Sequence, residues 1–239
     1  MRESTKRKFG LSALILSVAL VLVCAQFVCG VTASAEDNEN IGCTYYYEEL
    51  KNSDMAQRFY RAMEDMAAKG HFKKGTVEYD LLAEGVLTQA EVEGYVDNNS
   101  AKVPVALGAA RDAFYMDHPD LFYVDVYKLY LSAGMKEGKY AAYIGTGNAD
   151  NYYTENTFKS ETEVVSAITA YESALDAAVA AAKAGGGDSV SQIKAANEYI
   201  ANNVKYDYGA NKDAHDNVAY DGNVNTAYGA LVNKKAMCG

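Results

Sequence analysis

The sequence predicts an α+β fold in which helices dominate and a short β-hairpin lies between them. Two segments, residues 44–69 and 164–182, carry apolar side chains at the spacing that lines one face of a helix. Between these segments, residues 121–131 are aromatic and β-branched, and residues 140–144 are suited to pair with them as a second strand. The chain has 239 residues, which is enough for one or two domains with a sizeable core.

The first helix is predicted over residues 44–69, with Gly70 ending it. Its apolar face is formed by Met55, Phe59, Met63 and Met66. We interpret these methionines as adaptable core side chains and not as metal ligands. A short strand is expected after this helix, over residues 75–82.

Local signals predict two more helices before the hairpin. Thr88 and Glu91 have the spacing of a capping box, which predicts a helix to about Asp97. Pro104 suits the first turn of the next helix, and Pro119 limits its end. The buried positions of that helix are expected to include Leu107, Ala110 and Phe114. In the hairpin that follows, Gly134 and Gly138 are expected in the turn.

The long helix that begins near Ser160 is expected to end at the glycine triplet 185–187, where we place a soft domain boundary. The predicted domains are a signal peptide (1–35), a helix-rich N-terminal region (36–185) and a C-terminal region (186–239). The long helix has one apolar stripe, made of Val164, Ile168, Tyr171, Leu175, Val179 and Ala182.

The C-terminal region is predicted to begin with a helix capped at Ser189, followed by a polar surface loop over residues 209–225. The buried stripe of that helix is expected to consist of Ile193, Ala196, Ile200 and Val204. A further helix is expected within residues 225–232. After it, Cys238 lies where a new element should begin, and a helix start would lower the pKa of its thiol.

The N-terminus has the pattern of a secretory signal. A basic start precedes the apolar run Leu11–Val23, and Ala33-Ser34-Ala35 fits a cleavage site. A retained membrane anchor is the alternative, but this run is short for a membrane span. Lipidation at Cys24 or Cys29 is ranked lower, because no small residue stands just before either cysteine.

The charge balance excludes nucleic acid as a partner. Removing residues 1–35 takes away four basic and one acidic side chain, which leaves 18 basic and 31 acidic side chains and a net charge of −13. Such a chain repels nucleic acid and favours cationic partners weakly. The 20 tyrosines are interpreted mainly as half-buried packing residues, and a sugar- or peptide-binding surface is the less favoured reading.

Three side chains outside the signal are candidates for chemistry. Cys238 is open to three readings: a disulfide with Cys43, an unreactive buried thiol, or a nucleophile. His118 is interpreted as a structural turn residue. His215 has Asp213 and Asp216 beside it, but one histidine with two aspartates is a weak metal signal, so no metal and no cofactor is predicted.

The C-terminal stretch resembles the cysteine motif of the bacterial transglutaminase-like family, which shares papain-like catalytic logic. The family pattern is roughly Ala-Tyr-x-Ala-Leu-Val-x-Gly-Lys-Ala ahead of Val-Cys-x-Gly-Tyr, and here Asn233-Lys234 replaces the polar-Gly pair while Met237 replaces the valine. Two upstream segments are also similar to such proteins: residues 117–124, and residues 196–208, which contain the run Asn203–Asp207. The matching residues of the cysteine motif are Ala227, Tyr228, Ala230, Leu231, Val232, Lys235, Ala236 and Cys238.

This resemblance implies an exported or cell-surface protein of a Gram-positive bacterium, with Cys238 as the nucleophile for acyl transfer or hydrolysis at amide or peptide bonds. Its substrate would be a protein or peptide, such as a cell-wall or surface polypeptide. The histidine and aspartate partners follow the cysteine in the family, so residues 186–239 are expected to be the incomplete start of a transglutaminase-like core, inactive alone and less ordered from residue 209 onward. The alternative is a non-catalytic surface module with Cys238 structural or disulfide-bonded.

Overall fold

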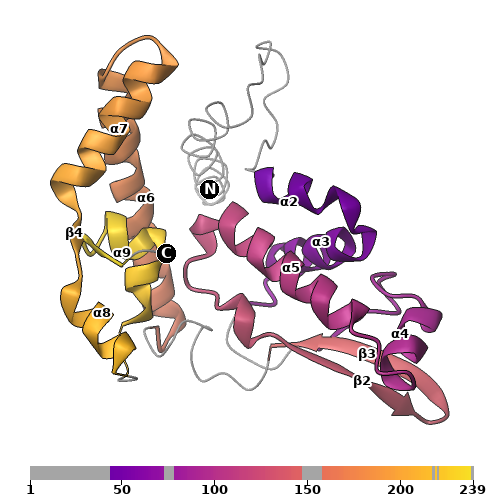
Figure 1. The fold of residues 1–239 in the computed structure, drawn as a ribbon. Helices are drawn as coiled ribbons and strands as arrows, with labels where there is room; N and C mark the ends of the chain where they lie inside the picture. Colours follow the sequence, from indigo (N-terminus) through magenta and orange to yellow (C-terminus); the bar gives the residue numbers. More distant parts are fainter. Residues whose placement is uncertain (1–43, 73–77, 147–157, 217–218, 220, 238–239) are drawn as a thin grey trace, which may run out of the picture. The chain divides into compact units, whose positions relative to one another are not determined.

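The computed structural model describes residues 44–72, 78–146, 158–216, 219 and 221–237. Among the described residues, the contacts group 46–161 as one compact unit and 162–237, with residues 44 and 45, as the other; the two are treated separately below as the first and the second unit. The molecule is rich in helix and has a small sheet of few strands, which agrees with the predicted α+β class (Figure 1).

The first unit is built on two long helices, α3 (Asp54–Ala68) and α5 (Lys102–Asp117), which pack against each other. The shorter helix α4 (Gln89–Val96) has the predicted capping box between Thr88 and Glu91. The remaining helical turns of this unit are α2 (Tyr45–Glu49), η1 (Leu50–Asn52), η2 (Pro119–Leu121) and η3 (Val126–Lys128).

The prediction of one continuous helix over residues 44–69 is wrong at one point, because the helix is interrupted between η1 and α3. Ser53 has non-helical backbone angles, and its side chain accepts a hydrogen bond from the Ala56 N–H. It therefore starts a new helix. The predicted end is confirmed: Gly70 follows the last turn with a φ of 69°.

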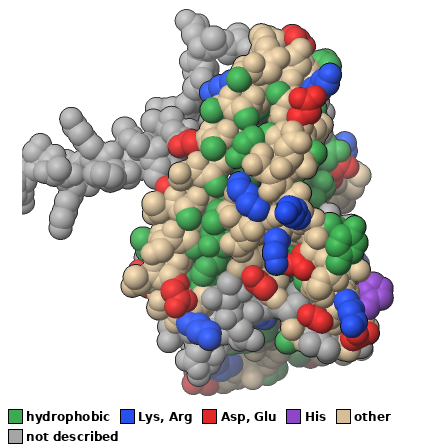
Figure 2. Space-filling view, turned by 90° about the vertical axis from the view of Figure 1, so that its left-hand side faces the viewer, with side chains coloured by type: hydrophobic (Ala, Val, Ile, Leu, Met, Phe, Trp, Pro, Cys, Tyr) green, Lys and Arg blue, Asp and Glu red, His purple; other side chains and the backbone are tan. Residues whose placement is uncertain are grey.

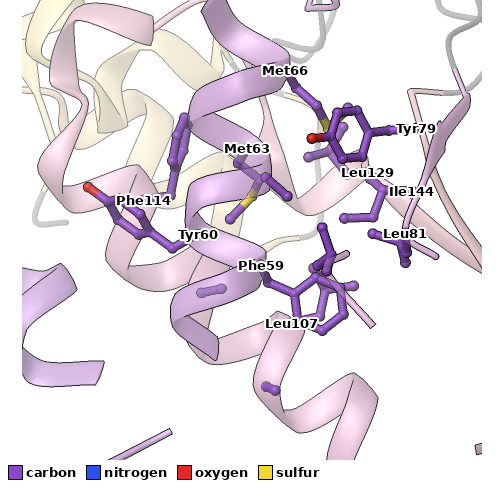
Figure 3. Close-up of a cluster of buried hydrophobic side chains, with 14 of the residues drawn as sticks. Phe59, Tyr60, Met63, Met66, Tyr79, Leu81, Leu107, Phe114, Leu129 and Ile144 are labelled. Atoms are coloured by element: carbon purple, nitrogen blue, oxygen red, sulfur yellow. The ribbon is translucent and has the colours of Figure 1, made fainter. Parts of the chain in front are cut away.

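The core of this unit lies between α3, α5 and the sheet. The close-up in Figure 3 shows the side chains that α3 contributes, Phe59, Tyr60, Met63 and Met66, turned toward residues of α5 and the strands. All four are buried, and so are the predicted α5 positions, whereas the predicted Met55 is half-buried and packs against this core. The helical periodicity thus identified the packing faces of α3 and α5 correctly.

The sheet is antiparallel with the order β1-β3-β2. Its strands are β1 (Glu78–Asp80), β2 (Tyr130–Lys136) and β3 (Lys139–Gly145). The predicted partner strand at residues 140–144 is confirmed, but Gly134 lies inside β2. The turn consists of Glu137 and Gly138, both with positive φ, which is the geometry that a tight hairpin with right-handed strand twist requires.

The strand predicted over residues 121–131 is wrong for most of its length. Its first part forms η2 and η3, and β2 starts only at Tyr130. The Asp125 side chain accepts a hydrogen bond from the Tyr127 N–H at 3.0 Å, which holds a turn in the middle of the segment. Phe122 and Val126 are nevertheless buried. Aromatic and β-branched composition therefore marked burial here and not extended backbone.

A buried carboxylate joins the helical elements of the first unit. Asp117 is 2% exposed, and its oxygens accept hydrogen bonds from the N–H groups of Tyr46 (3.1 Å) and Tyr47 (2.9 Å) and from the Tyr60 hydroxyl (3.0 Å). The end of α5 is thereby joined to α2 and α3. His118 Nε2 lies 3.2 Å from the same hydroxyl, and its ring lies 4.2 Å from that of Phe114. This is a structural setting for His118.

The second unit begins with two helices, α6 (Glu161–Ala184) and α7 (Ser189–Asn203). As predicted, α6 ends just before the glycine triplet 185–187, and α7 starts shortly after it. The α6 stripe is buried as predicted, except that Ile168 is half-buried. By length and composition alone, α6 is also the one described helix that could cross a membrane, a test that core helices of soluble proteins pass too.

Two predictions for α7 are wrong. Its cap is Asp188, one residue before the predicted cap at Ser189. The Asp188 side chain accepts a hydrogen bond from the Ser191 N–H. Within the described part of the chain no residue of α7 is buried, and Ile193 and Ile200 are 36% and 40% exposed. Periodicity identifies the apolar face of a helix, but it does not say whether another element covers that face.

The loop predicted over residues 209–225 is also wrong, because it contains helix α8 (Tyr208–His215) and the turn η4 (Gly222–Asn225). Asp207 caps α8 by accepting a hydrogen bond from the Ala210 N–H. The helix predicted within residues 225–232 is confirmed as α9 (Ala227–Leu231). Strands β4 (Lys205–Tyr206) and β5 (Lys235–Ala236) complete the unit.

Replacing Asp117 by alanine is expected to destabilise the first unit by about 2–4 kcal/mol, because the substitution leaves a buried tyrosine hydroxyl and two N–H groups without their charged acceptor. Hydrogen exchange at the amides of α3 and α5 measures this loss. Asp112 is the control, since its exposed carboxylate accepts only the Tyr127 hydroxyl among the described residues, and Asp112→Ala should cost about 0.5 kcal/mol or less. Equal effects of the two substitutions would contradict the role given to Asp117.

Candidate functional site around the β4–β5 pair

The candidate nucleophile Cys238 lies outside the described residues, as does Cys43, so the site is built from the chain that leads to Cys238. The last described residue is Met237, and its N–H donates to the Val224 carbonyl at 2.8 Å. Val224 is buried in η4. The backbone is therefore held by a defined contact up to the residue before the cysteine.

A short parallel pair of strands sets the course of this backbone. Lys205 pairs with Lys235, and Tyr206 pairs with Ala236. Two flanking hydrogen bonds support the pair, from the Lys205 N–H to the Lys234 carbonyl and from the Asp207 N–H to the Ala236 carbonyl, each at 2.9 Å. The segment Asn203–Asp207 and the cysteine motif, which were singled out separately in the sequence, thus lie side by side.

Asp207 links β4, β5 and α8. Its Oδ1 accepts the Ala210 N–H at 3.0 Å, and its Oδ2 lies 3.4 Å from the Lys235 ammonium. The Ala210 N–H and, to a smaller degree, the Lys235 ammonium hold the pKa of this carboxyl below its usual range. Because the folded-state pKa is the lower one, the stabilisation is present above the unfolded pKa of about 4 and is lost as pH falls through the folded value.

The turn η4 and helix α9 form the support beneath β5. Thr226 caps α9, since its hydroxyl accepts the Gly229 N–H at 3.2 Å and donates to the Asn223 carbonyl at 2.8 Å. Gly229 touches this same carbonyl so closely that an added Cβ would lie 2.6 Å from its carbon and would overlap its oxygen. The Lys235 carbonyl would lie 3.2 Å from that Cβ. Glycine at 229 therefore lets α9 pack on both η4 and β5.

Asn223 is a buried residue of this support that the sequence did not single out. Its side chain is 1% exposed, and its Oδ1 accepts no hydrogen bond from any described residue. A buried amide oxygen without a donor is unfavourable by roughly 1–3 kcal/mol. Asn223 lies in the polar stretch 209–225, for which the sequence predicts a surface loop, so no sequence signal identified it as buried.

Lys234 adopts a backbone conformation that side chains rarely take. Its φ is 57°, in the left-handed region, and its ammonium lies 5.7 Å from the ring centroid of Tyr199. A non-glycine residue in this region is strained by roughly 1–2 kcal/mol. Position 234 is the one at which the transglutaminase-like pattern has glycine.

The two candidate histidines belong to different units. His118 belongs to the first unit and was described with Asp117. His215 is an exposed residue near the end of α8, with Nδ1 3.1 Å from the Asn211 carbonyl oxygen. Among the residues with described positions, no three His, Cys, Asp or Glu side chains gather in a way that would hold a metal ion.

The comparisons with known proteins add no family: no protein-family model, curated protein or solved structure matches this chain.

Substituting Gly229 by alanine is expected to destabilise the β4–β5 region by about 3 kcal/mol, because the new methyl group meets backbone that has no room to move. The Val232 N–H donates to the Tyr228 carbonyl at the end of α9, so its exchange rate measures local opening. Gly94 is the matched control: it lies inside α4 with open space around it, and Gly94→Ala should stabilise by about 0.5–1 kcal/mol. A neutral Gly229→Ala would refute the packing of α9 on η4.

The variant Lys234→Gly is expected to keep the stability of this region or to raise it by up to about 1 kcal/mol, since glycine adopts positive φ without strain. The control Lys235→Gly, in β5, should destabilise by about 1 kcal/mol because glycine weakens a strand. Exchange at the Asp207 N–H, which bonds to β5, reports both changes. The reverse order of the two variants would disprove the left-handed conformation of Lys234.

Proposed function

We propose that this chain is an exported transglutaminase-like protein in which the Cys238 thiolate is the nucleophile for acyl transfer or hydrolysis at amide bonds. The observation that carries the proposal is the β4–β5 pair. It joins the Asn203–Asp207 segment to the residues just ahead of Cys238. Both segments resemble the same family. If both resemblances are genuine, the two segments should belong to one folded core and lie close together.

The conformation of Lys234 supports the same proposal from another direction. A glycine in the resembling pattern implies that the chain takes a positive φ at this position. Lys234 has that φ even though lysine disfavours it. The backbone course ahead of Cys238 is therefore compatible with the pattern despite the substituted side chain.

In the proposed reaction the thiolate attacks the carbonyl carbon of an amide. The C–N bond breaks, a thioester forms, and the leaving amine takes a proton from an imidazolium. Attack by water on the thioester then gives a carboxylic acid, and attack by an amine gives a new amide. Backbone N–H groups near Cys238 would stabilise the oxyanion. No cofactor takes part in this chemistry.

The imidazole and the carboxylate that orients it are assigned by the resemblance to residues after the cysteine. His118 and His215 both precede it, and each has a structural setting, so neither is proposed as the base. The other parts of the proposal have two sources: the signal pattern of residues 1–35 supports export, and the family resemblance implies a secreted or cell-surface location and a polypeptide substrate.

In a protein that carries the imidazole assigned to residues after the cysteine, Cys238 is expected to react with iodoacetamide at pH 6 much faster than an unperturbed thiol, whose pKa is about 8.5. The rate of alkylation is measured between pH 5 and 9 by mass spectrometry of the Cys238 and Cys43 peptides. The Cys43 peptide from the same digest serves as the internal comparison.

Two results would contradict the nucleophile assignment. One is a pH–rate curve of Cys238 that coincides with that of Cys43. The other is a Cys43–Cys238 disulfide peptide in a non-reduced digest, which would favour the alternative of a non-catalytic surface module in which Cys238 is structural.

A further inference from the structure

Three lysines gather around the β4–β5 pair and form what we call the lysine surface: Lys205, Lys234 and Lys235. Lys205 and Lys235 are paired in register on adjacent strands, and the Lys205 N–H binds the carbonyl of Lys234. Figure 2 shows basic side chains close together in the middle of the face that carries α7, β4 and α8. This gathering contrasts with the whole chain, whose net charge is −10.

The charges on this surface are not balanced within the described chain. Lys235 lies 3.4 Å from Asp207, whereas Lys205 and Lys234 form no ion pair with any described residue. Like charges at paired strand positions repel each other, and so they destabilise the pair. An anion bound from outside would relieve this repulsion.

Lys234 adds a second reason to regard the surface as more than a solvated face. Its strained backbone costs free energy that glycine would avoid, and its ammonium is held over the Tyr199 ring at 5.7 Å. Strain of this kind is common where a side chain serves a ligand. The aromatic ring beneath the ammonium limits the positions that the charge can take.

We propose that Lys205, Lys234 and Lys235 bind an acidic segment of the polypeptide on which Cys238 acts. The choice of a polypeptide rests on the proposed function. The covalent chain sets the distance: Lys235 precedes Cys238 by three residues, so their Cα atoms are at most about 11 Å apart. Acidic side chains within about three residues of the reacting amide would therefore reach the lysine surface.

The test measures binding without turnover, in the full chain with Cys238→Ala. The probe is a fluorescein-labelled decamer of glutamate, and a labelled decamer of glutamine is the neutral control. Binding of each peptide is measured by fluorescence anisotropy at several salt concentrations. The variant is Lys205→Gln with Lys234→Gly, in which the second substitution also relieves strain and so preserves folding. The matched control is Lys194→Gln, which removes a lysine from α7 of the same unit, about 14 Å along the helix axis from Asn203 at the end of α7.

The expected result is binding of the glutamate decamer that weakens with salt, that falls about fivefold or more in the double variant and that is unchanged in the Lys194 control. An equal affinity of the double variant, or an equal loss in the control, overturns the proposal. Binding of inorganic polyphosphate at the lysine surface without binding of the glutamate decamer also overturns it.

The outcome can be separated from that of the proposed function. An activated Cys238 without decamer binding refutes the lysine surface alone. Decamer binding at the lysine surface together with an ordinary thiol at Cys238 refutes the nucleophile and leaves a binding site for acidic peptides.

Discussion

The parallel pairing of β4 with β5 is the constraint on which the candidate site depends. Parallel strands need a crossover connection, and here residues 207–234 supply it with α8, η4 and α9. Each part of the crossover is fixed by a local device, namely the Asp207 cap, the Thr226 cap and the close approach at Gly229. Four residues of strand could not close so long a segment by themselves, so the caps and the packing of α9 must contribute.

Sequence reasoning succeeded where the signal was local or periodic. The capping box of Thr88 and Glu91, the end at Gly70 and the buried faces of α3 and α5 all follow from spacing within one element. The strand prediction for residues 121–131 failed because their composition indicates burial, whereas the Asp125 side chain holds the backbone in a turn. The prediction that the apolar stripe of α7 is buried failed, because burial depends on neighbouring elements that the sequence of one helix does not reveal.

Within the candidate site the same division holds. The segments that meet at the β4–β5 pair were visible in the sequence, but their pairing depends on contacts between residues about 30 positions apart. The left-handed φ of Lys234 and the Asn223 oxygen, which no described residue bonds, had no sequence signal, because both arise from the tertiary arrangement. The contacts divide the chain after Glu161, whereas the glycine triplet predicts a boundary at 185, and the domain limits stay a prediction.

Cys238 is the proposed nucleophile, and the backbone that leads to it is held by β5 and the Met237 hydrogen bond. The most direct test is the ionisation of the thiol itself. A protein labelled with ¹³C at cysteine Cβ, titrated by NMR, gives the pKa of Cys238 without any reagent or substrate. If Cys238 is the nucleophile, its thiol has a pKa below about 7, in the range of activated thiols. A pKa at or above about 8.5 would contradict it, because such a thiol has no more thiolate at neutral pH than an ordinary cysteine.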